Sequence, residues 1–144
     1  MNIVHFRLLS SEGRIPSKGS AGAAGYDLCS AENCIIFPYS TVKINTDLAI
    51  ICPPNTYCRI VDRSSLAYKK QLHVIGGVVD PDYRGNIQVV LHNLGANINF
   101  IHKGERFAQI IFENFTDVIF EEKFEEFSLT SRGNNGFGSS DNSN

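Results

Sequence analysis

The fold is decided by one stretch of the sequence, Gly76-Gly77-Val78-Val79-Asp80-Pro81-Asp82-Tyr83-Arg84-Gly85-Asn86-Ile87. Apolar runs flank it at Leu72–Val79 and Ile87–Leu91, and β-branched residues dominate both, so each run predicts a strand. Between these runs Pro81 fixes φ and Gly85 can adopt φ > 0, which is typical of a turn. The stretch therefore predicts a β-hairpin.

The tip of this hairpin combines two acids, an aromatic ring and a base, namely Asp80, Asp82, Tyr83 and Arg84. The adjoining glycine pair, Gly76–Gly77, would let a ligand approach the backbone closely. Function often resides in loops, yet most loops only connect strands, so an ordinary hairpin with a charged tip explains this stretch equally well.

Length and composition describe a single globular domain. The chain has 144 residues, enough to bury a sizeable core, and 42% of them are hydrophobic, with ten Phe and no Trp. The net charge of −2 gives no electrostatic argument for binding nucleic acid or a membrane, although a nucleotide needs only local positive charge. No apolar run approaches the roughly 18 residues of a membrane span, and the N-terminus lacks the pattern of a secretory signal. These features predict a soluble intracellular protein of the cytoplasm or nucleus.

The cysteines and histidines argue against a zinc site. The four cysteines, Cys29, Cys34, Cys52 and Cys58, form no C-x-x-C pair, and the four histidines are scattered. A reducing intracellular compartment is therefore expected.

Short apolar segments separated by turn residues continue along the whole chain. Strands are predicted over Ile3–Leu9, Ala24–Leu28, Ile35–Phe37, Val42–Cys52, Thr56–Val61, Ile98–Ile101 and Arg106–Phe112, with a strand-like Val118–Phe120 inside an acidic run. Many short strands with closely spaced turns and almost no helix indicate an all-β barrel or sandwich.

One short helix is predicted directly after Arg63, with Ser64 or Ser65 as its N-cap and then Leu66 and Ala67. Free N–H groups at a helix start, a hydroxyl and an Arg together form an anion site. A plain capped turn with a surface Arg is the alternative.

Three further positions each allow two interpretations. Asp27 is either a solvated acid at a strand end or a functional carboxylate. Gln109 lies inside an apolar strand, where a buried amide needs partners, and pairing with backbone at a sheet edge would supply them. The tail Ser128–Asn144, rich in Ser, Asn and Gly, is either disordered or a ligand clamp in which Phe137 stacks on a ligand.

Five segments, in this order and at this spacing, closely resemble the five motifs of the trimeric dUTPase family. They are Ala24-Gly25-Tyr26-Asp27-Leu28, Arg63-Ser64-Ser65-Leu66-Ala67, Gly77-Val78-Val79-Asp80-Pro81-Asp82-Tyr83-Arg84-Gly85, Gly104-Glu105-Arg106-Phe107-Ala108-Gln109, and Arg132-Gly133 through Gly136-Phe137-Gly138-Ser139. The resemblance implies a jelly-roll-like β-barrel of residues 1–127 that assembles as a homotrimer. It also implies that a flexible tail of residues 128–144 closes a neighbouring active site.

The resemblance implies hydrolysis of dUTP to dUMP and pyrophosphate with Mg²⁺, which limits uracil in DNA and supplies dUMP for dTMP synthesis. Asp80 resembles the general base that activates water to attack the α-phosphorus, a role that suits a carboxylate. Tyr83 resembles the residue stacked under the deoxyribose, where it leaves no room for a ribose 2′-OH. The backbone at Gly77 and Val78 would pair with uracil and exclude a 5-methyl group.

Other motif residues would hold the triphosphate. Arg63, Ser64 and Ser65 resemble the phosphate-binding segment, and Gln109 would bind the α-phosphate region or the attacking water. Asp27 would hold waters of the Mg²⁺ shell rather than the metal itself, since Mg²⁺ commonly sits on substrate phosphates and water.

The tail would complete the site, as the resemblance implies. Arg132 would reach the terminal phosphate, and Phe137, followed by Gly138, would stack on uracil and close the site.

The chain departs from the family pattern at four positions. Asp62 stands where Pro is usual, and a carboxylate there is expected to pair with Arg63 and weaken its hold on phosphate. Ser65 and Asn135 replace Gly, and Val74 stands where some members have Asn. These departures concern affinity rather than reaction type.

Two alternatives to dUTP hydrolysis remain. A dCTP deaminase-type enzyme shares the fold but uses a Glu as proton shuttle, and the contexts of Asp80 and Gly136-Phe137-Gly138 fit a dUTPase better. A catalytically silent module would bind a protein partner, and the intact motif residues argue against it. No stable nucleic-acid or membrane partner is expected.

Overall fold

The computed structural model describes residues 2–139 and residue 141, so Met1, Ser140 and 142–144, at the ends of the predicted domain and tail, lie outside the described residues. This part of the chain is mostly β-structure with one short helix, as predicted. Its elements are β1 (His5–Leu8), β2 (Tyr26–Cys29), β3 (Cys34–Ile36), β4 (Thr41–Asn45), β5 (Leu48–Ile51), β6 (Thr56–Val61), α1 (Ser64–Lys70), β7 (Leu72–Ile75), β8 (Val78–Val79), β9 (Gln88–Asn93), β10 (Asn99–Ile101) and β11 (Arg106–Asn114).

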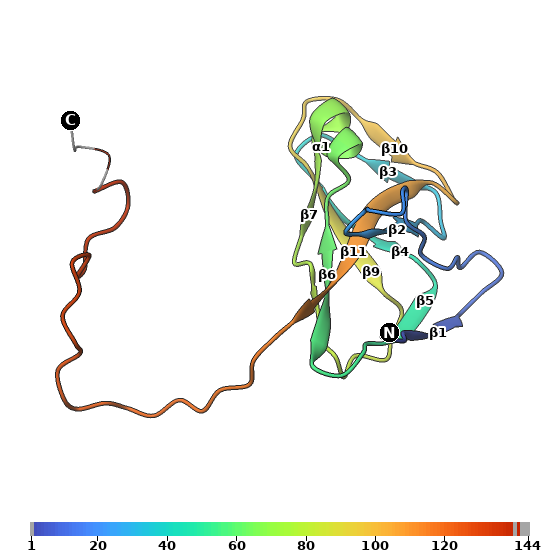
Figure 1. Ribbon diagram of the computed structural model, residues 1–144. Coiled ribbons are helices and arrows are strands. Elements are labelled where there is room, and N and C mark those ends of the chain that lie inside the picture. The colour runs from blue at the N-terminus through green and yellow to red at the C-terminus, as the bar shows by residue number, and fades with distance from the viewer. Residues whose placement is uncertain (1, 140, 142–144) are drawn as a thin grey trace.

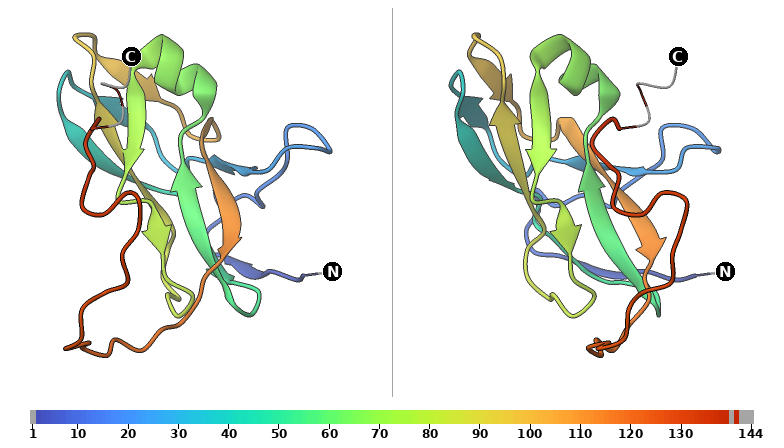
Figure 2. Two further views of the ribbon diagram at one scale, coloured as in Figure 1. Left: turned by 60° about the vertical axis from the view of Figure 1, so that its left-hand side comes forward. Right: turned by 90° about the vertical axis from the view of Figure 1, so that its left-hand side faces the viewer.

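The strands form two larger sheets and two ribbons, in a jelly-roll-like arrangement (Figures 1 and 2). The larger sheets have the strand orders β2-β11-β6-β8 and β4-β9-β7, and β1-β5 and β10-β3 are two-stranded. Every pairing is antiparallel. In the described residues, no helix is long and apolar enough to cross a membrane.

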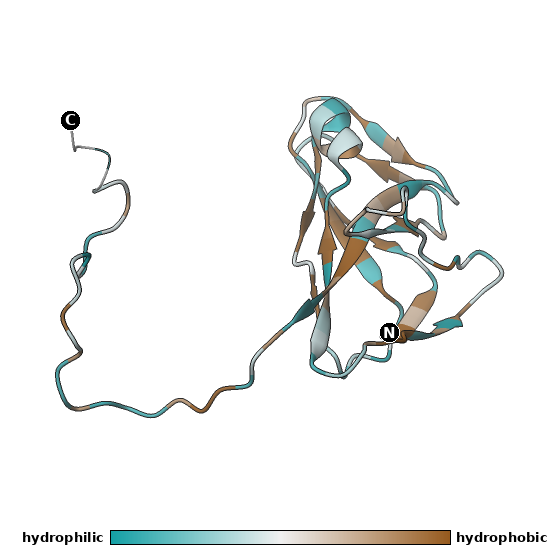
Figure 3. Cartoon of the chain, in the orientation of Figure 1, coloured by the Kyte–Doolittle hydropathy of each residue, from teal (hydrophilic) through white to brown (hydrophobic). Residues whose placement is uncertain are grey.

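One hydrophobic core joins the two larger sheets. On β6 and β9 buried residues alternate with more exposed ones, which is typical of strands that present one face to a core. Cys58 and Ile60 of β6 meet Val89 and Leu91 of β9 in the same buried cluster. Hydrophobic residues accordingly gather on the strands of the body in Figure 3.

The prediction of one long strand over Val42–Cys52 is wrong, because the chain changes sheets within it. β4 pairs with β9, whereas β5 pairs with β1. The break falls at Thr46, whose hydroxyl donates to the Ile87 carbonyl at 2.7 Å, and at Asp47, which has a φ of 51°. A residue in the left-handed backbone conformation cannot continue a strand. The run of apolar residues therefore continues across a corner at which the chain passes from one sheet to another.

The central hairpin is confirmed in its pairing and corrected in its detail. β7 pairs with β9 as predicted, but Leu72–Val79 is not one strand, because Gly76 has a φ of 61° and β8 turns away to pair with β6. Gly77 packs directly against β6: its carbonyl accepts the Ile60 N–H at 2.7 Å, and a Cβ on Gly77 would overlap the Ile60 carbonyl. The close approach that glycine allows here is therefore to the protein's own backbone.

The predicted strand Val118–Phe120 is also wrong. β11 ends at Asn114, and beyond it the chain runs away from the body as an extended tail (Figure 1). The side chains of Val118, Ile119 and Phe120 are exposed. A strand requires a hydrogen-bonded neighbour, and the described part of this single chain offers none at that place.

Candidate active site

The loop between β8 and β9 is held in shape by its own hydrogen bonds. The Asp80 carbonyl accepts the Tyr83 N–H at 3.1 Å, and the Tyr83 hydroxyl donates to the Asn86 carbonyl at 2.8 Å. Arg84 Nη1 donates to the Pro81 carbonyl at 2.7 Å. Because Asp80 uses its carbonyl rather than its carboxylate in this turn, the exposed carboxylate stays available for chemistry.

A hollow of about 200 Å³ opens beside this loop, between the two larger sheets. Val78, Asp80 and Tyr83 line it, so the structure brings these three predicted site residues together. A neighbouring hollow on the other side of β8 is lined by Gly77, Val78 and Asp62.

Two polar side chains lie next to each other on the four-stranded sheet. Asp27 of β2 lies opposite Gln109 of β11, and Gln109 lies opposite Val61 of β6. Directly opposite residues of antiparallel strands point to the same face, so Asp27 and Gln109 are neighbours on one side of the sheet. Asp27 is buried, with 9% of its surface exposed, and is therefore not a solvated acid at a strand end.

The Asp27 carboxylate is paired with two arginines. Arg63 Nε lies 3.0 Å from Asp27 Oδ1, and Arg106 Nη1 lies 3.7 Å from Asp27 Oδ2. Arg63 Nη1 also donates to the Arg106 carbonyl at 2.9 Å. These contacts hold the Arg63 side chain against β2 and β11.

The expected pairing of Asp62 with Arg63 is wrong. The Asp62 carboxylate instead contacts His73 Nδ1 at 2.9 Å and accepts the Val74 N–H at 2.5 Å. Sequence reasoning missed His73, because nothing local signals a pair between the residue after β6 and a residue of β7, 11 positions further along the chain.

Gln109 satisfies its amide inside the sheet rather than at an edge, because β11 lies between β2 and β6. Its Nε2 donates to the Asp62 carbonyl at 2.8 Å. Its Oε1 lies where a Cβ on Gly25 would be, so a larger residue at position 25 would displace this amide. Gly25, in the first of the five motif-like segments, thus leaves room for the side chain of Gln109.

The prediction that Ser64 or Ser65 is the N-cap of the helix is wrong, because the helix starts earlier. Arg63 is the N-cap, in extended conformation with φ −87° and ψ 127°, and no side chain caps the helix. The Arg63 carbonyl accepts the N–H groups of Leu66 and Ala67, each at 3.0 Å. Ser64 and Ser65 occupy the first turn with exposed side chains, and their N–H groups precede the first intrahelical bonds.

The structure does not bring the tail residues to the other site residues. Arg132 and Asn135 form a turn of their own, in which the Arg132 carbonyl accepts the Asn135 N–H at 3.1 Å. Phe137 is fully exposed with a φ of 54°, and Gly138 follows with a φ of 86°. Figure 1 shows this segment well away from the body of the molecule.

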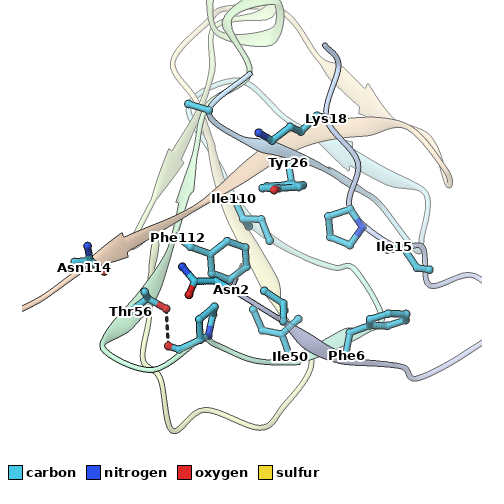
Figure 4. A pocket seen from close by; sticks show the side chains of 14 residues that line it. Asn2, Phe6, Ile15, Lys18, Tyr26, Ile50, Thr56, Ile110, Phe112 and Asn114 are labelled. Carbon is cyan, nitrogen blue, oxygen red and sulfur yellow. Dashed lines mark hydrogen bonds between the residues drawn. The ribbon is translucent and has the colours of Figure 1, made fainter. Parts of the chain in front are cut away.

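A further cavity lies elsewhere and holds none of the predicted site residues. It has a volume of about 550 Å³ and lies between the N-terminal segment and β11, where Lys18 stands over the Tyr26 ring (Figure 4). Phe112, Ile110 and Ile50 give it an apolar floor. Its lining offers no acid, so the smaller hollow at Asp80 is the better candidate for chemistry.

Within the described residues, no three His, Cys, Asp or Glu side chains gather in a way that could hold a metal ion. Asp27 stands alone as a carboxylate among Arg63, Arg106 and Gln109. This donor set fits a Mg²⁺ ion carried by substrate phosphates better than a metal held by a cage of protein ligands.

Comparison with known proteins adds independent information. Residues 11–141 match the model of the family described as dUTPase. A Candida albicans protein named deoxyuridine 5′-triphosphate nucleotidohydrolase is 44% identical over 133 residues, which cover 92% of this chain and 84% of that protein. A Fowlpox virus protein of the same name is 43% identical over 133 residues, which cover 91% of this chain and 92% of that protein.

Solved structures show the same fold. A variant of the Staphylococcus bacteriophage 80alpha dUTPase, solved with dUpNHpp, has a TM-score of 0.90 at 27% identity and covers 97% of this chain and 99% of its own. A variant dUTPase from phage phi11 of S. aureus has a TM-score of 0.82 at 24% identity, over 88% of this chain and 100% of its own. The latter structure is described as revealing the coordination of a structural Mg(II) ion.

Proposed function

The chain belongs to the dUTPase family and hydrolyses deoxyuridine 5′-triphosphate, and we propose that Asp80 is the general base of this reaction. Its carboxylate takes a proton from water as the water attacks the α-phosphorus, and dUMP and pyrophosphate leave. One observation carries this assignment: Asp80 lines the same hollow as Tyr83 and Val78 and is exposed to solvent. A general base must reach the proton that it removes, and this carboxylate is open to water.

Tyr83 selects the sugar in this proposal. Its hydroxyl is anchored to the Asn86 carbonyl, which fixes the ring at the wall of the hollow. A ring held in place excludes an added 2′-OH by contact, whereas a mobile ring would yield.

The outer edge of β8 recognises uracil. β8 is the last strand of its sheet and pairs on one side with β6. Backbone N–H and C=O groups on the free side of an edge strand are available to a ligand. The Gly77–Val78 backbone can therefore pair with the uracil edge, as a strand would.

Arg63, Ser64, Ser65 and Gln109 receive the phosphates. Arg63 and the first N–H groups of α1 supply donors, and Gln109 orients the α-phosphate or the attacking water. The Arg63–Asp27 pair lies beside this set and brings the phosphate end close to a carboxylate.

Mg²⁺ bound to the substrate phosphates would neutralise part of their charge and fix their arrangement. Asp27 would accept hydrogen bonds from waters around the ion. Its pairing with Arg63 and Arg106 fits this indirect role, because an acid that is already neutralised by two arginines is a weak direct ligand.

The protein works as a homotrimer in this proposal, with residues 1–127 as its domain and 128–144 as a tail that closes a neighbouring site. The course of the tail supports this, since the described part of the segment after β11 runs away from the body of its own chain (Figure 1). In a closed site Arg132 reaches the terminal phosphate, and Phe137 stacks on uracil. The four free cysteines support an intracellular setting, where thiols stay reduced.

Pyrophosphate release from dUTP, measured with and without Mg²⁺, tests the proposal. Release that depends on Mg²⁺ and is at least about tenfold slower with UTP or dTTP is expected. Ammonia released from dCTP instead would identify a deaminase, and no release from either nucleotide would identify a binding module.

A further inference from the structure

The Asp62 side chain joins the two larger sheets at one point. β6 ends at Val61 and belongs to the four-stranded sheet, whereas β7 belongs to the three-stranded sheet. Asp62 Oδ2 contacts His73 Nδ1 at 2.9 Å, and Asp62 Oδ1 accepts the Val74 N–H at 2.5 Å, both on β7. Both side chains are about one-third exposed, with 34% for Asp62 and 35% for His73, so water competes only partly with these bonds.

This contact lies at a joint that no strand ladder holds. At this end of β6 the last residue paired with a neighbouring strand is Val61, which lies opposite Gln109 of β11. The helix α1 begins at Ser64. Asp62 and Arg63 therefore connect a strand to a helix without ladder bonds of their own. The carboxylate of Asp62 supplies the tie to β7 that the ladder does not.

Two groups of the proposed site depend on the position of this joint. The Asp62 carbonyl accepts Gln109 Nε2 at 2.8 Å, and the other end of the amide fills the space at Gly25. The next residue, Arg63, reaches Asp27. A shift of the backbone at Asp62 would thus move an acceptor of Gln109 and the base of the Arg63 side chain together.

We propose that Asp62 and His73 are positioning residues for dUTP hydrolysis, which hold the end of β6 so that Gln109 and Arg63 face the triphosphate. Neither residue touches substrate in this assignment. The proposal rests on the proposed function, and it names two residues of this chain that the family motifs do not include. Neutral and protonated imidazole can both donate from Nδ1, so the tie does not require a charged histidine.

Steady-state hydrolysis of dUTP by the full chain tests this role. Asp62→Ala removes both side-chain bonds and should lower kcat/KM by about tenfold, the effect of losing a hydrogen bond to a charged group. Asp62→Asn keeps an acceptor for the Val74 N–H and can donate to the imidazole, so it should recover to within about threefold of the parent.

Two double variants separate positioning from a general loss of stability. Asp62→Ala with His73→Ala should be no slower than Asp62→Ala alone, because the two residues act as one unit. In a Gln109→Ala background, Asp62→Ala should have less than about half its usual effect on log kcat/KM, since the amide is gone and only Arg63 remains to be positioned. An undiminished effect in that background would overturn the proposal.

Thr56→Ala is the matched control. Thr56 lies at the other end of β6, and its buried hydroxyl donates to the Pro53 carbonyl at 2.7 Å, so the variant loses a hydrogen bond on the same strand away from the site. Its melting temperature should fall while kcat and KM stay within about twofold of the parent.

The remaining outcomes are also decisive. If Asp62→Ala does not fold, His73→Ala carries the test with an expected loss of about threefold or more in kcat/KM. An active parent with unchanged Asp62 and His73 variants would overturn this inference alone. A parent that releases no pyrophosphate from dUTP would overturn the proposed function and the inference with it.

Discussion

The Arg63 guanidinium is held by the Asp27 carboxylate, with Nε and Oδ1 3.0 Å apart. Both side chains are mostly shielded from water, and Arg106 adds a second, longer contact to the same carboxylate. A guanidinium has five N–H donors, so a phosphate that binds Arg63 would share the group with this internal acid. Asp27 would thus act on both the stability of the fold and the orientation of Arg63.

Asp27→Asn should lower both stability and the response to Mg²⁺. Removing a partly buried partner of two arginines should cost roughly 1–3 kcal/mol in the free energy of unfolding, because charged hydrogen bonds are lost. The Mg²⁺ concentration for half-maximal activity should rise, since the carboxylate no longer orders waters around the ion. Urea unfolding and a Mg²⁺ titration of activity measure the two effects.

Glu12→Gln is the control for this prediction. It breaks the exposed Lys103–Glu12 pair and should change the free energy of unfolding by less than about 1 kcal/mol. If Asp27→Asn needed the same Mg²⁺ concentration as the parent, Asp27 would act only through its ion pairs with the two arginines.

Asp80→Asn should fold normally and bind dUTP but turn it over roughly 10²–10⁴ times more slowly, the usual effect of losing a general base. The side chain is exposed and the turn uses its carbonyl, so the melting temperature should not change. Single-turnover kinetics and calorimetric titration with a non-hydrolysable dUTP analogue separate binding from chemistry. A variant that turned over nearly as fast as the parent would remove Asp80 from this role.

The sequence predicts the elements of this fold better than their partners. Strands such as Thr56–Val61 and the β7–β9 pairing follow from local patterns of β-branched residues. The corner at Asp47 and the departure of β8 at Gly76 were missed, because each apolar run continues through a change of sheet. Local hydropathy reports that a residue is buried but not which sheet buries it.

The same limit applies to the site. Asp80 and Tyr83 are neighbours in sequence, so their common loop could be predicted. The bond between Asp62 and His73 could not, because it depends on how two sheets pack. The expectation that Asp62 would pair with adjacent Arg63 failed because Arg63 turns towards β2, where Asp27 holds it.

Tyr83→Ala should admit UTP better relative to dUTP, because the ring is proposed to occupy the space of the 2′-OH. The ratio of kcat/KM for dUTP to that for UTP should fall at least about tenfold. Tyr83→Phe is the matched control: it keeps the ring but loses the hydrogen bond to Asn86 that is proposed to hold it, so the ratio should fall less than in Tyr83→Ala. If the ratio does not move in Tyr83→Ala, another residue discriminates the sugar.

Stability should fall at alkaline pH because of Cys58. Burial, with a smaller contribution from Cys52, raises the pKa of the Cys58 thiol from 9.0 to about 12. Above pH 9 the unfolded chain loses this proton while the folded chain retains it, so the stabilising contribution is complete below pH 9 and is lost as pH rises towards 12. The free energy of unfolding should decrease by up to about 1.4 kcal/mol per pH unit from this group.

Urea unfolding at several pH values from roughly 8 to 11 tests this. The measurements give the slope of the free energy of unfolding against pH for each protein. Cys58→Ala should show a shallower alkaline slope than the parent. Burial also raises the pKa of the Cys34 thiol, which is less buried, so Cys34→Ala should keep a slope nearer that of the parent. Identical slopes in all three proteins would show that other groups cause the alkaline loss.

The shared active site can be tested by mixing two inactive proteins. The tail of residues 128–144 can span roughly 55 Å when extended, enough to reach a neighbouring protomer. Suppose that the base and the tail of one site come from different subunits. Asp80→Asn trimers are then inactive, and trimers truncated before Arg132 are nearly so. The two proteins are unfolded together in equal amounts and refolded.

Random assembly around a three-fold axis then restores some sites. A working site needs Asp80 from a truncated protomer and a tail from an Asp80→Asn protomer, which occurs at about a quarter of the sites. Activity should therefore rise to roughly a quarter of that of the parent, from two parents with almost none. Refolding each variant alone controls for recovery, and the mixture of separately refolded trimers controls for exchange. If base and tail came from one chain, no mixed trimer could contain a complete site. Activity that stayed at the level of the separate variants would place each tail on its own subunit and leave the chemistry at Asp80 unaffected.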